Sequence, residues 1–216
     1  MPTVMPRNVR VGFKAALCFP LLAWSCACAA ADTSAAAAEI ATATTPLPAL
    51  MKDAAAVVRL DAAGKPEQLR AGSNDMVCIA DLPGDADFDV RCYNKDFIAV
   101  VYRSFQLRRQ VGTHGGVSET IEAEIKAGRI KLPEQPTAGY RCLGPASAYA
   151  AATNTTKPPM HCWQSIHFPY RTAAELGLLD ESQVTEAQKA MLPYVMSSGK
   201  YWSHVMIEHP EPAANP

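Results

Sequence analysis

The chain has 216 residues, of which 49% are hydrophobic and 19% are charged, a composition typical of globular proteins rather than of disordered or multi-span membrane proteins. Its formal net charge is -1, so it lacks the basic excess that neutralises phosphates, and we expect no nucleic-acid partner. The length favours one domain.

The first residues follow the order of a secretory signal peptide. Arg7, Arg10 and Lys14 precede a short apolar run at residues 15–24, and small residues follow it. The run is about half of the roughly twenty apolar residues that span a bilayer. We therefore expect residues 1–31 to be a signal peptide, and the protein to be exported to the periplasm or secreted.

Cys26 provides an alternative to simple cleavage. It follows a short aliphatic and small stretch at residues 21–25, which is typical of a lipidated cysteine, although Trp24 departs from that pattern. The protein would then meet the membrane only through its signal peptide or through a lipid on Cys26.

The cysteines beyond the signal segment are Cys78, Cys92, Cys142 and Cys162. An even number in an exported protein predicts two disulfides, because the compartment is oxidising. ProGly at residues 83–84 predicts a turn, and a hairpin centred on Asp85 places Cys78 opposite Cys92. Cys142 and Cys162 then pair by default, although four cysteines allow three connectivities.

The expected domain boundaries follow changes in composition. Residues 32–56 are rich in Ala, Thr and Pro and lack apolar periodicity, which predicts a flexible leader. A single α+β domain is expected over residues 57–207, beginning with strands near 57–60 and 68–70. Residues 208–216 are expected to be a frayed tail.

Two main helices are expected after the hairpin. Phe97, Val101 and Phe105 recur at helical spacing within residues 95–110. A second helix is expected to begin at Ser118, as its N-cap, and to end near Gly128. The arginines of this region alternate with glutamates and are expected to form a solvated surface, without a ligand; they are Arg103, Arg108 and Arg109, with Glu119, Glu122 and Glu124.

The last third is expected to be irregular at first and regular later. Frequent Pro and Gly predict loops over residues 133–160, with a short strand near 140–143. An extended segment, two short helices and two final strands should follow, at residues 162–170, 172–179, 185–192, 194–196 and 201–207. The predicted fold is α+β, with a small antiparallel sheet, two main helices and stabilising disulfides.

Several short segments resemble a group of uncharacterised exported bacterial proteins. They are LRAGSN at residues 69–74, Cys78, Asp81, Cys92 with Tyr93, the arginine-bearing helix expected within residues 95–110, and SHVMI at residues 203–207. The likeness covers about residues 57–207. No activity is known for the group, so the resemblance assigns no functional residue.

His161, His167 and His204 are the candidate metal ligands, because imidazole suits zinc and copper. His161 and His167 share one face of an extended segment, but they lie too far apart to hold one ion without a bend. We expect ordinary hydrogen-bonded histidines, and therefore no metal and no cofactor. A metal-assisted envelope hydrolase that uses His161, His167 or His204 is the alternative.

Other chemical motifs are incomplete, so the catalytic residues stay unknown. Asp85, Asp87 and Asp89 have the spacing that begins an EF-hand, but Val90 stands where that loop needs Gly. HGG at residues 114–116 resembles an oxyanion loop, yet the GxSxG motif that it would serve is absent from the sequence.

Aromatic residues gather near the C-terminus. Tyr194 and Trp202 would suit a platform for sugars or peptides if they were exposed, but core packing is the expectation. The sequence favours a noncatalytic binding or interaction module of the bacterial envelope, whose partner is a small molecule, a glycan or an envelope protein. Whether the protein is an enzyme stays open.

Overall fold

The computed structural model describes residues 35–82, 86–111 and 115–208. The expected signal peptide, Cys26, Asp85 and the expected tail from residue 209 onwards lie outside these residues. Within the described ranges, no helix has the length and apolar character needed to cross a membrane.

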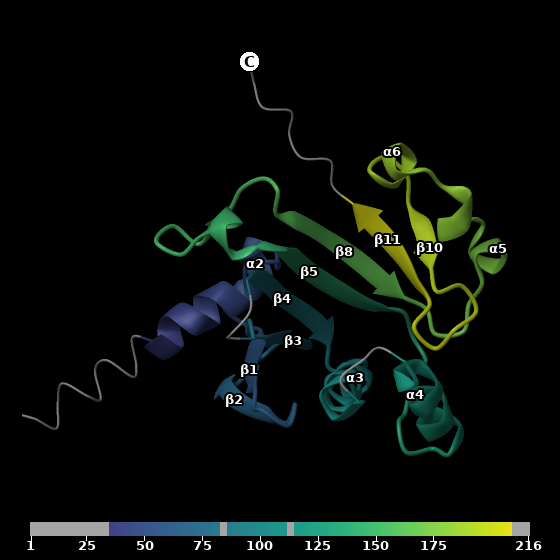
Figure 1. Cartoon of the computed structure of the whole chain (residues 1–216), viewed down its shortest axis with the longest axis horizontal. Helices are drawn as coiled ribbons and strands as arrows, with labels where there is room; N and C mark the ends of the chain where they lie inside the picture. The colour runs from purple at the N-terminus through teal and green to yellow at the C-terminus, as the bar shows by residue number, and fades with distance from the viewer. Residues whose placement is uncertain (1–34, 83–85, 112–114, 209–216) are drawn as a thin grey trace, which may run out of the picture. The chain divides into compact units, whose positions relative to one another are not determined.

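A nine-stranded sheet, in the order β2-β1-β3-β4-β5-β8-β11-β10-β9, organises the described chain (Figure 1). Its strands are β1 (Ala56–Leu60), β2 (Pro66–Arg70), β3 (Met76–Ile79), β4 (Asp87–Asn94), β5 (Thr137–Pro145), β8 (His161–His167), β9 (Leu179–Asp180), β10 (Tyr194–Met196) and β11 (His204–Glu208). β1 runs parallel to β3, and β9 runs parallel to β10. The α+β class is therefore confirmed, but the expected small antiparallel sheet is wrong, because the sheet is large and mixed.

Helices α3 (Ile98–Val111) and α4 (Val117–Lys126) are the two main helices, and they lie together on one side of the sheet in Figure 1. Their apolar side chains pack with Tyr93 and Tyr201 in one core cluster. The N-cap of α4 is Gly116, with φ of 76°, rather than Ser118. Ser118 is already inside the helix, because the chain makes its left-handed turn two residues earlier.

The remaining elements are short. They are α2 (Ala49–Lys52), α5 (Ala173–Leu176), α6 (Glu186–Lys189), the 3-10 turns η1 (Ala146–Ala148) and η2 (Glu181–Gln183), and the paired strands β6 (Tyr149–Ala150) and β7 (Thr155–Thr156). Thr172 and Thr185 close capping boxes at the starts of α5 and α6, which explains why such short helices begin where they do.

Part of the segment that was expected to be a flexible leader has regular structure and buried side chains in the described residues. Residues 35–43 are helical, and Ala43 and Leu47 are buried in a cluster with Cys78 and Cys92. Asn154 fixes this helix, because its amide donates to the carbonyl of Ala41 at 3.1 Å. Small Ala side chains permit close packing here, which apolar periodicity does not reveal.

β5 corrects the expectation of a loop-rich segment over residues 133–160. It runs for nine residues in the middle of the sheet, between β4 and β8. Gly139 and Gly144 lie inside the strand, where the backbone has close neighbours; a Cβ on Gly144 would lie 3.0 Å from Cα of Met160. These glycines mark close approach rather than turns.

Both disulfides join directly opposed positions of neighbouring strands. Cys78 on β3 bonds Cys92 on β4, and Cys142 on β5 bonds Cys162 on β8. The hairpin register predicted the first pair, and the second is the default pairing. The two bonds are consistent with an oxidising, extracytoplasmic location.

Candidate functional site

One face of the sheet carries the polar and aromatic side chains that converge. Strand register places Arg91, Arg141 and Trp163 in one row across β4, β5 and β8. Residues opposed in register project from the same face of a sheet, and side chains two positions along a strand project from it again. Two further rows therefore lie on this face. The next row consists of Tyr93, Gly139, Ser165 and Met206. The row after it consists of Thr137, His167, His204 and Met196.

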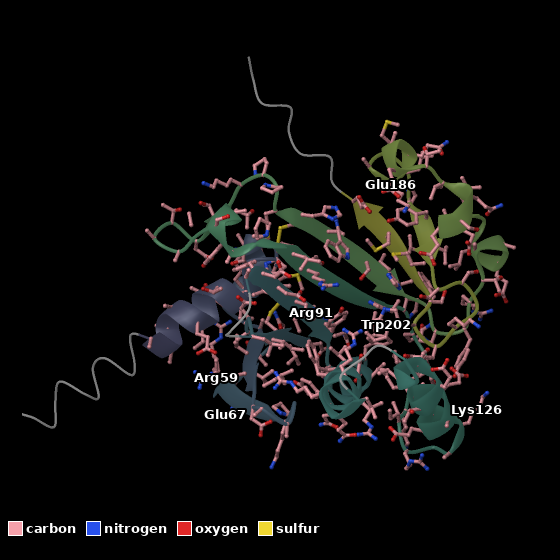
Figure 2. The ribbon with its side chains drawn as sticks, in the orientation of Figure 1. Arg59, Glu67, Arg91, Lys126, Glu186 and Trp202 are labelled. Carbon is pink, nitrogen blue, oxygen red and sulfur yellow. A yellow bond between two sulfur atoms is a disulfide. The ribbon has the colours of Figure 1, made fainter. Side chains whose placement is uncertain are left out.

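These rows form the floor of a cavity of about 200 Å³ that we call the arginine pocket. Arg108 from α3 and Trp202 from the β10–β11 loop close its wall. Figure 2 shows Arg91 and Trp202 on the side of the sheet where α3 and α4 lie. The lining consists of Arg91, Tyr93, Arg108, Arg141, Trp163, Ser165, His167, Met196, Trp202, His204 and Met206.

Gly139 shapes the floor by having no side chain. A Cβ at this position would lie 2.8 Å from Oγ of Ser165, 3.0 Å from Cε1 of Tyr93 and 3.1 Å from Nε2 of His167. These contacts are closer than carbon atoms normally tolerate, so only glycine lets the three side chains approach one another.

Asp89 is the carboxylate that holds the sheet arginines. It accepts two hydrogen bonds of 2.8 Å from Nε and Nη2 of Arg141, and one from Nη2 of Arg91. Burial alone would raise the pKa of Asp89, but the hydrogen bond from Arg141 and the charges of both arginines lower it below its ordinary value. Asp89 therefore stays ionised and neutralises one of the two charges.

Arg108 adds a further positive charge without a carboxylate of its own in the lining. Burial lowers the pKa of Arg108, and repulsion from Arg91 and Arg141 lowers it further. Even so, a guanidinium remains charged in proteins. The lining thus holds three arginines and, among the described residues, no Asp or Glu side chain.

Aromatic rings hold the sheet arginines in place. The guanidinium carbon of Arg91 lies 4.9 Å from the ring centre of Phe105 on α3, and that of Arg141 lies 5.2 Å from the ring of Trp163. Such contacts favour a weakly hydrated guanidinium and fix its orientation. The positive groups are thus positioned before any ligand arrives.

His167 and His204 contribute neutral hydrogen-bonding groups. Their rings stack with centres 4.9 Å apart. Burial and the neighbouring His204 lower the pKa of His167 well below 6.5, and burial also lowers the pKa of His204. His204 Nδ1 lies 2.7 Å from the carbonyl of Trp202, so it acts as the donor in that bond. Both rings are therefore neutral near pH 7.

Two buried nitrogen atoms of the pocket residues lack a hydrogen-bond partner among the described residues. They are Nε of Arg91 and Nδ1 of His167. Buried polar atoms in native proteins are nearly always hydrogen-bonded, so each one calls for an explanation. A ligand or water that accepts a hydrogen bond from Arg91 would supply it.

The structure separates the three histidines that were candidate metal ligands. His161 stands at the opposite end of β8 from His167, half exposed, with Nε2 3.2 Å from Oε2 of Glu208. Cys162 is held in a disulfide. In the ranges that the structure describes, no group of three His, Cys, Asp or Glu side chains could hold a metal ion.

Reasoning from the sequence missed most of this pocket. Arg108 is exposed, as expected, but it also lines the pocket, which the sequence did not indicate. Arg103 pairs with Glu124 on α4 through hydrogen bonds of 2.8 and 2.6 Å. The available signal was the alternation of Asp89, Arg91 and Tyr93 along a strand, which places charged groups on a face that the adjacent helix covers.

Tyr194 and Trp202, for which core packing was expected, lie in different surroundings. Tyr194 is buried and donates a hydrogen bond of 2.7 Å to Glu208. Trp202 packs partly against the core, with its ring centre 5.0 Å from that of Phe97, and it also lines the arginine pocket.

Comparison with protein-family models, curated proteins and solved structures finds no match.

Proposed function

We propose that this protein is a noncatalytic binding module of the bacterial envelope and that it captures a small anionic ligand in the arginine pocket. The observation that carries the proposal is the meeting of Arg91, Arg108 and Arg141 around one small cavity, with Asp89 as the counter-charge that Arg91 and Arg141 share. Guanidinium groups bind carboxylate and phosphate oxygens through paired hydrogen bonds.

The finer location belongs to the same proposal. The order of charged, apolar and small residues over 1–31 supports cleavage and release into the periplasm or the medium, and Cys26 supports a lipid anchor as the alternative. Both locations leave the arginine pocket in the oxidising compartment that the disulfides require.

Titration calorimetry with inorganic phosphate and with acetate tests the proposal. Wild type should bind at least one of them, and Arg108→Gln should weaken that binding about tenfold, which corresponds to about 1.4 kcal/mol. Arg109→Gln is the matched control, because Arg109 is the next residue on α3, is also exposed, and donates to the carbonyl of Ala62 rather than lining the pocket.

Comparing the two variants distinguishes anion binding in the arginine pocket from a general effect of positive surface charge. Equal loss in Arg108→Gln and Arg109→Gln, or no anion binding in wild type, would overturn the proposal. The metal-assisted hydrolase that the histidines suggested gains no support from their placement, since only His167 and His204 come together.

A further inference from the structure

A second cavity adjoins the arginine pocket. It also has a volume of about 200 Å³ and shares Arg108 and Trp202 with the arginine pocket. We call it the serine cavity, and its lining consists of Ser104, Arg108, Val117, Ser118, Ser197, Tyr201 and Trp202. The two cavities are therefore adjacent, and Arg108 and Trp202 contribute to both.

The chemistry of the serine cavity differs from that of the arginine pocket. Its lining carries four hydroxyl groups, from three serines and Tyr201, beside the indole of Trp202. Hydroxyls both donate and accept hydrogen bonds, as the hydroxyls of a sugar do. An indole ring adds a flat apolar face with a polar edge, which suits the face of a sugar ring. The serine cavity thus favours a polyhydroxylated body over an aliphatic one.

The charge of the arginine pocket distinguishes between classes of anion. Among the described residues, Asp89 is the carboxylate that hydrogen-bonds to the arginines of this pocket, through Arg91 and Arg141, so three positive charges face one negative charge. Glu181, which accepts a hydrogen bond from the amide of Ser197 at 3.3 Å, lies outside the lining and acts only weakly on His204 through its charge. A phosphate monoester carries about -1.5 to -2 charges at pH 7, whereas a carboxylate or a sulfate monoester carries one.

We propose that the two cavities together take a sugar phosphate monoester, with the phosphoryl group held by Arg91, Arg108 and Arg141 and the sugar held by Trp202 and the serine hydroxyls. This proposal rests on the proposed function, because it names the class of anion that the arginine pocket captures. The buried Nε of Arg91, which has no partner among the described residues, donates to a phosphoryl oxygen in this arrangement.

Calorimetric titration with four probes tests the class: the phosphate monoester of glucose, inorganic phosphate, glucuronate and glucose. The glucose phosphate should bind about tenfold more tightly than inorganic phosphate and than glucuronate. Glucose alone, which lacks the anion, should bind more weakly than all three.

Variants then separate the two cavities. Ser104→Ala and Trp202→Phe should each weaken glucose phosphate about threefold to tenfold while changing the affinity for inorganic phosphate less. Arg108→Gln should weaken both ligands, and Arg109→Gln should weaken neither. Ser104→Ala is the conservative variant that keeps the test valid if Trp202→Phe unfolds, because Trp202 also packs against Phe97.

Each outcome has a distinct meaning. If inorganic phosphate binds but glucose phosphate gains nothing, the sugar assignment is wrong and the anion-binding function stands. If glucuronate binds as tightly as glucose phosphate, the proposed preference for a doubly charged phosphate over a carboxylate is wrong. If no anion binds, the proposed function fails together with this inference.

Discussion

Arg91 and Arg141 face each other directly across β4 and β5, and both donate hydrogen bonds to the carboxylate of Asp89. Like charges in opposed positions of a sheet repel. Asp89 therefore both stabilises this part of the sheet and holds two guanidinium groups in the lining of the arginine pocket.

Replacing the carboxylate of Asp89 should lower the stability of the protein and raise the affinity of the arginine pocket for anions. Asp89→Asn should lower the free energy of unfolding at neutral pH by about 2 kcal/mol, because hydrogen bonds to charged groups are lost and two arginines are left without a counter-charge. Inorganic phosphate should restore part of that loss. Urea unfolding with and without phosphate measures both effects, and an Asp89→Asn protein as stable as wild type would contradict the prediction.

The same carboxylate gives a pH dependence of known sign. The pKa of Asp89 lies below its ordinary value of 3.8 in the folded protein, so the unfolded chain takes up the proton first as the pH falls. The contribution of Asp89 to the free energy of unfolding is present above pH 3.8 and is lost as the pH falls through the lowered pKa of the folded protein. The free energy of unfolding, measured with urea, should therefore fall less between about pH 5 and about pH 3 in Asp89→Asn than in wild type.

Gly139→Ala should disturb the floor of the pocket. Its Cβ would lie 2.8 Å from Oγ of Ser165, and overpacking of this kind costs about 1–3 kcal/mol. Gly128→Ala is the control, since a Cβ there has no neighbour within 4 Å and the cost is only that of its φ of 70°. Thermal unfolding should rank Gly139→Ala below Gly128→Ala, and the reverse order would show that the strand relaxes freely around the new methyl group.

Acidification should destabilise the protein through its stacked histidines. Burial, together with His204, lowers the pKa of His167 well below 6.5, so the unfolded chain takes up the proton first. This contribution is complete above pH 6.5 and is lost as the pH falls towards the lowered value.

Melting curves between about pH 7 and pH 5 test this directly. The midpoint should fall with pH in wild type and in His161→Asn, which changes a half-exposed histidine outside the pocket. It should fall less in His167→Asn, or in His204→Asn if the first variant does not fold. A parallel fall in all variants would assign the effect to other groups.

The two disulfides should differ in their reactivity towards reductant. Cys78 and Cys92 are 0% exposed, whereas Cys162 is only partly buried and lines a surface cavity beside Trp163. A thiolate must reach a sulfur atom to attack it. Brief treatment of the folded protein with dithiothreitol, followed by alkylation and mass spectrometry, should label Cys142 and Cys162 first. Earlier labelling of Cys78 and Cys92 would show that the covering N-terminal segment opens readily.

The sequence was most informative where signals are local. The hairpin register followed from ProGly and strand alternation, and the main helices followed from the spacing of Phe97, Val101 and Phe105. Non-local features escaped it. Proline and glycine suggested loops where β5 runs, because close approach and turn formation leave the same residue signature.

The candidate site was predictable only in part. The sequence singled out Trp202 as a candidate binding residue. It also singled out His161, His167 and His204, but as candidate metal ligands, a role that their positions do not support. The arginine pocket depends on Arg91 and Arg141 meeting across two strands about 50 residues apart, with Arg108 arriving from a helix. No local pattern encodes that register.

The N-terminal helix has a consequence for the order in which the molecule becomes structured. Ala41 is bound by Asn154, 113 positions later, and Thr42 by Tyr149, 107 positions later. Residues 35–43 can therefore dock in this position only when those later residues are in place. Synthesis runs from the N-terminus, so residues 35–43 are made before the residues that bind them. We therefore expect this helix to pack over Cys92 late in folding.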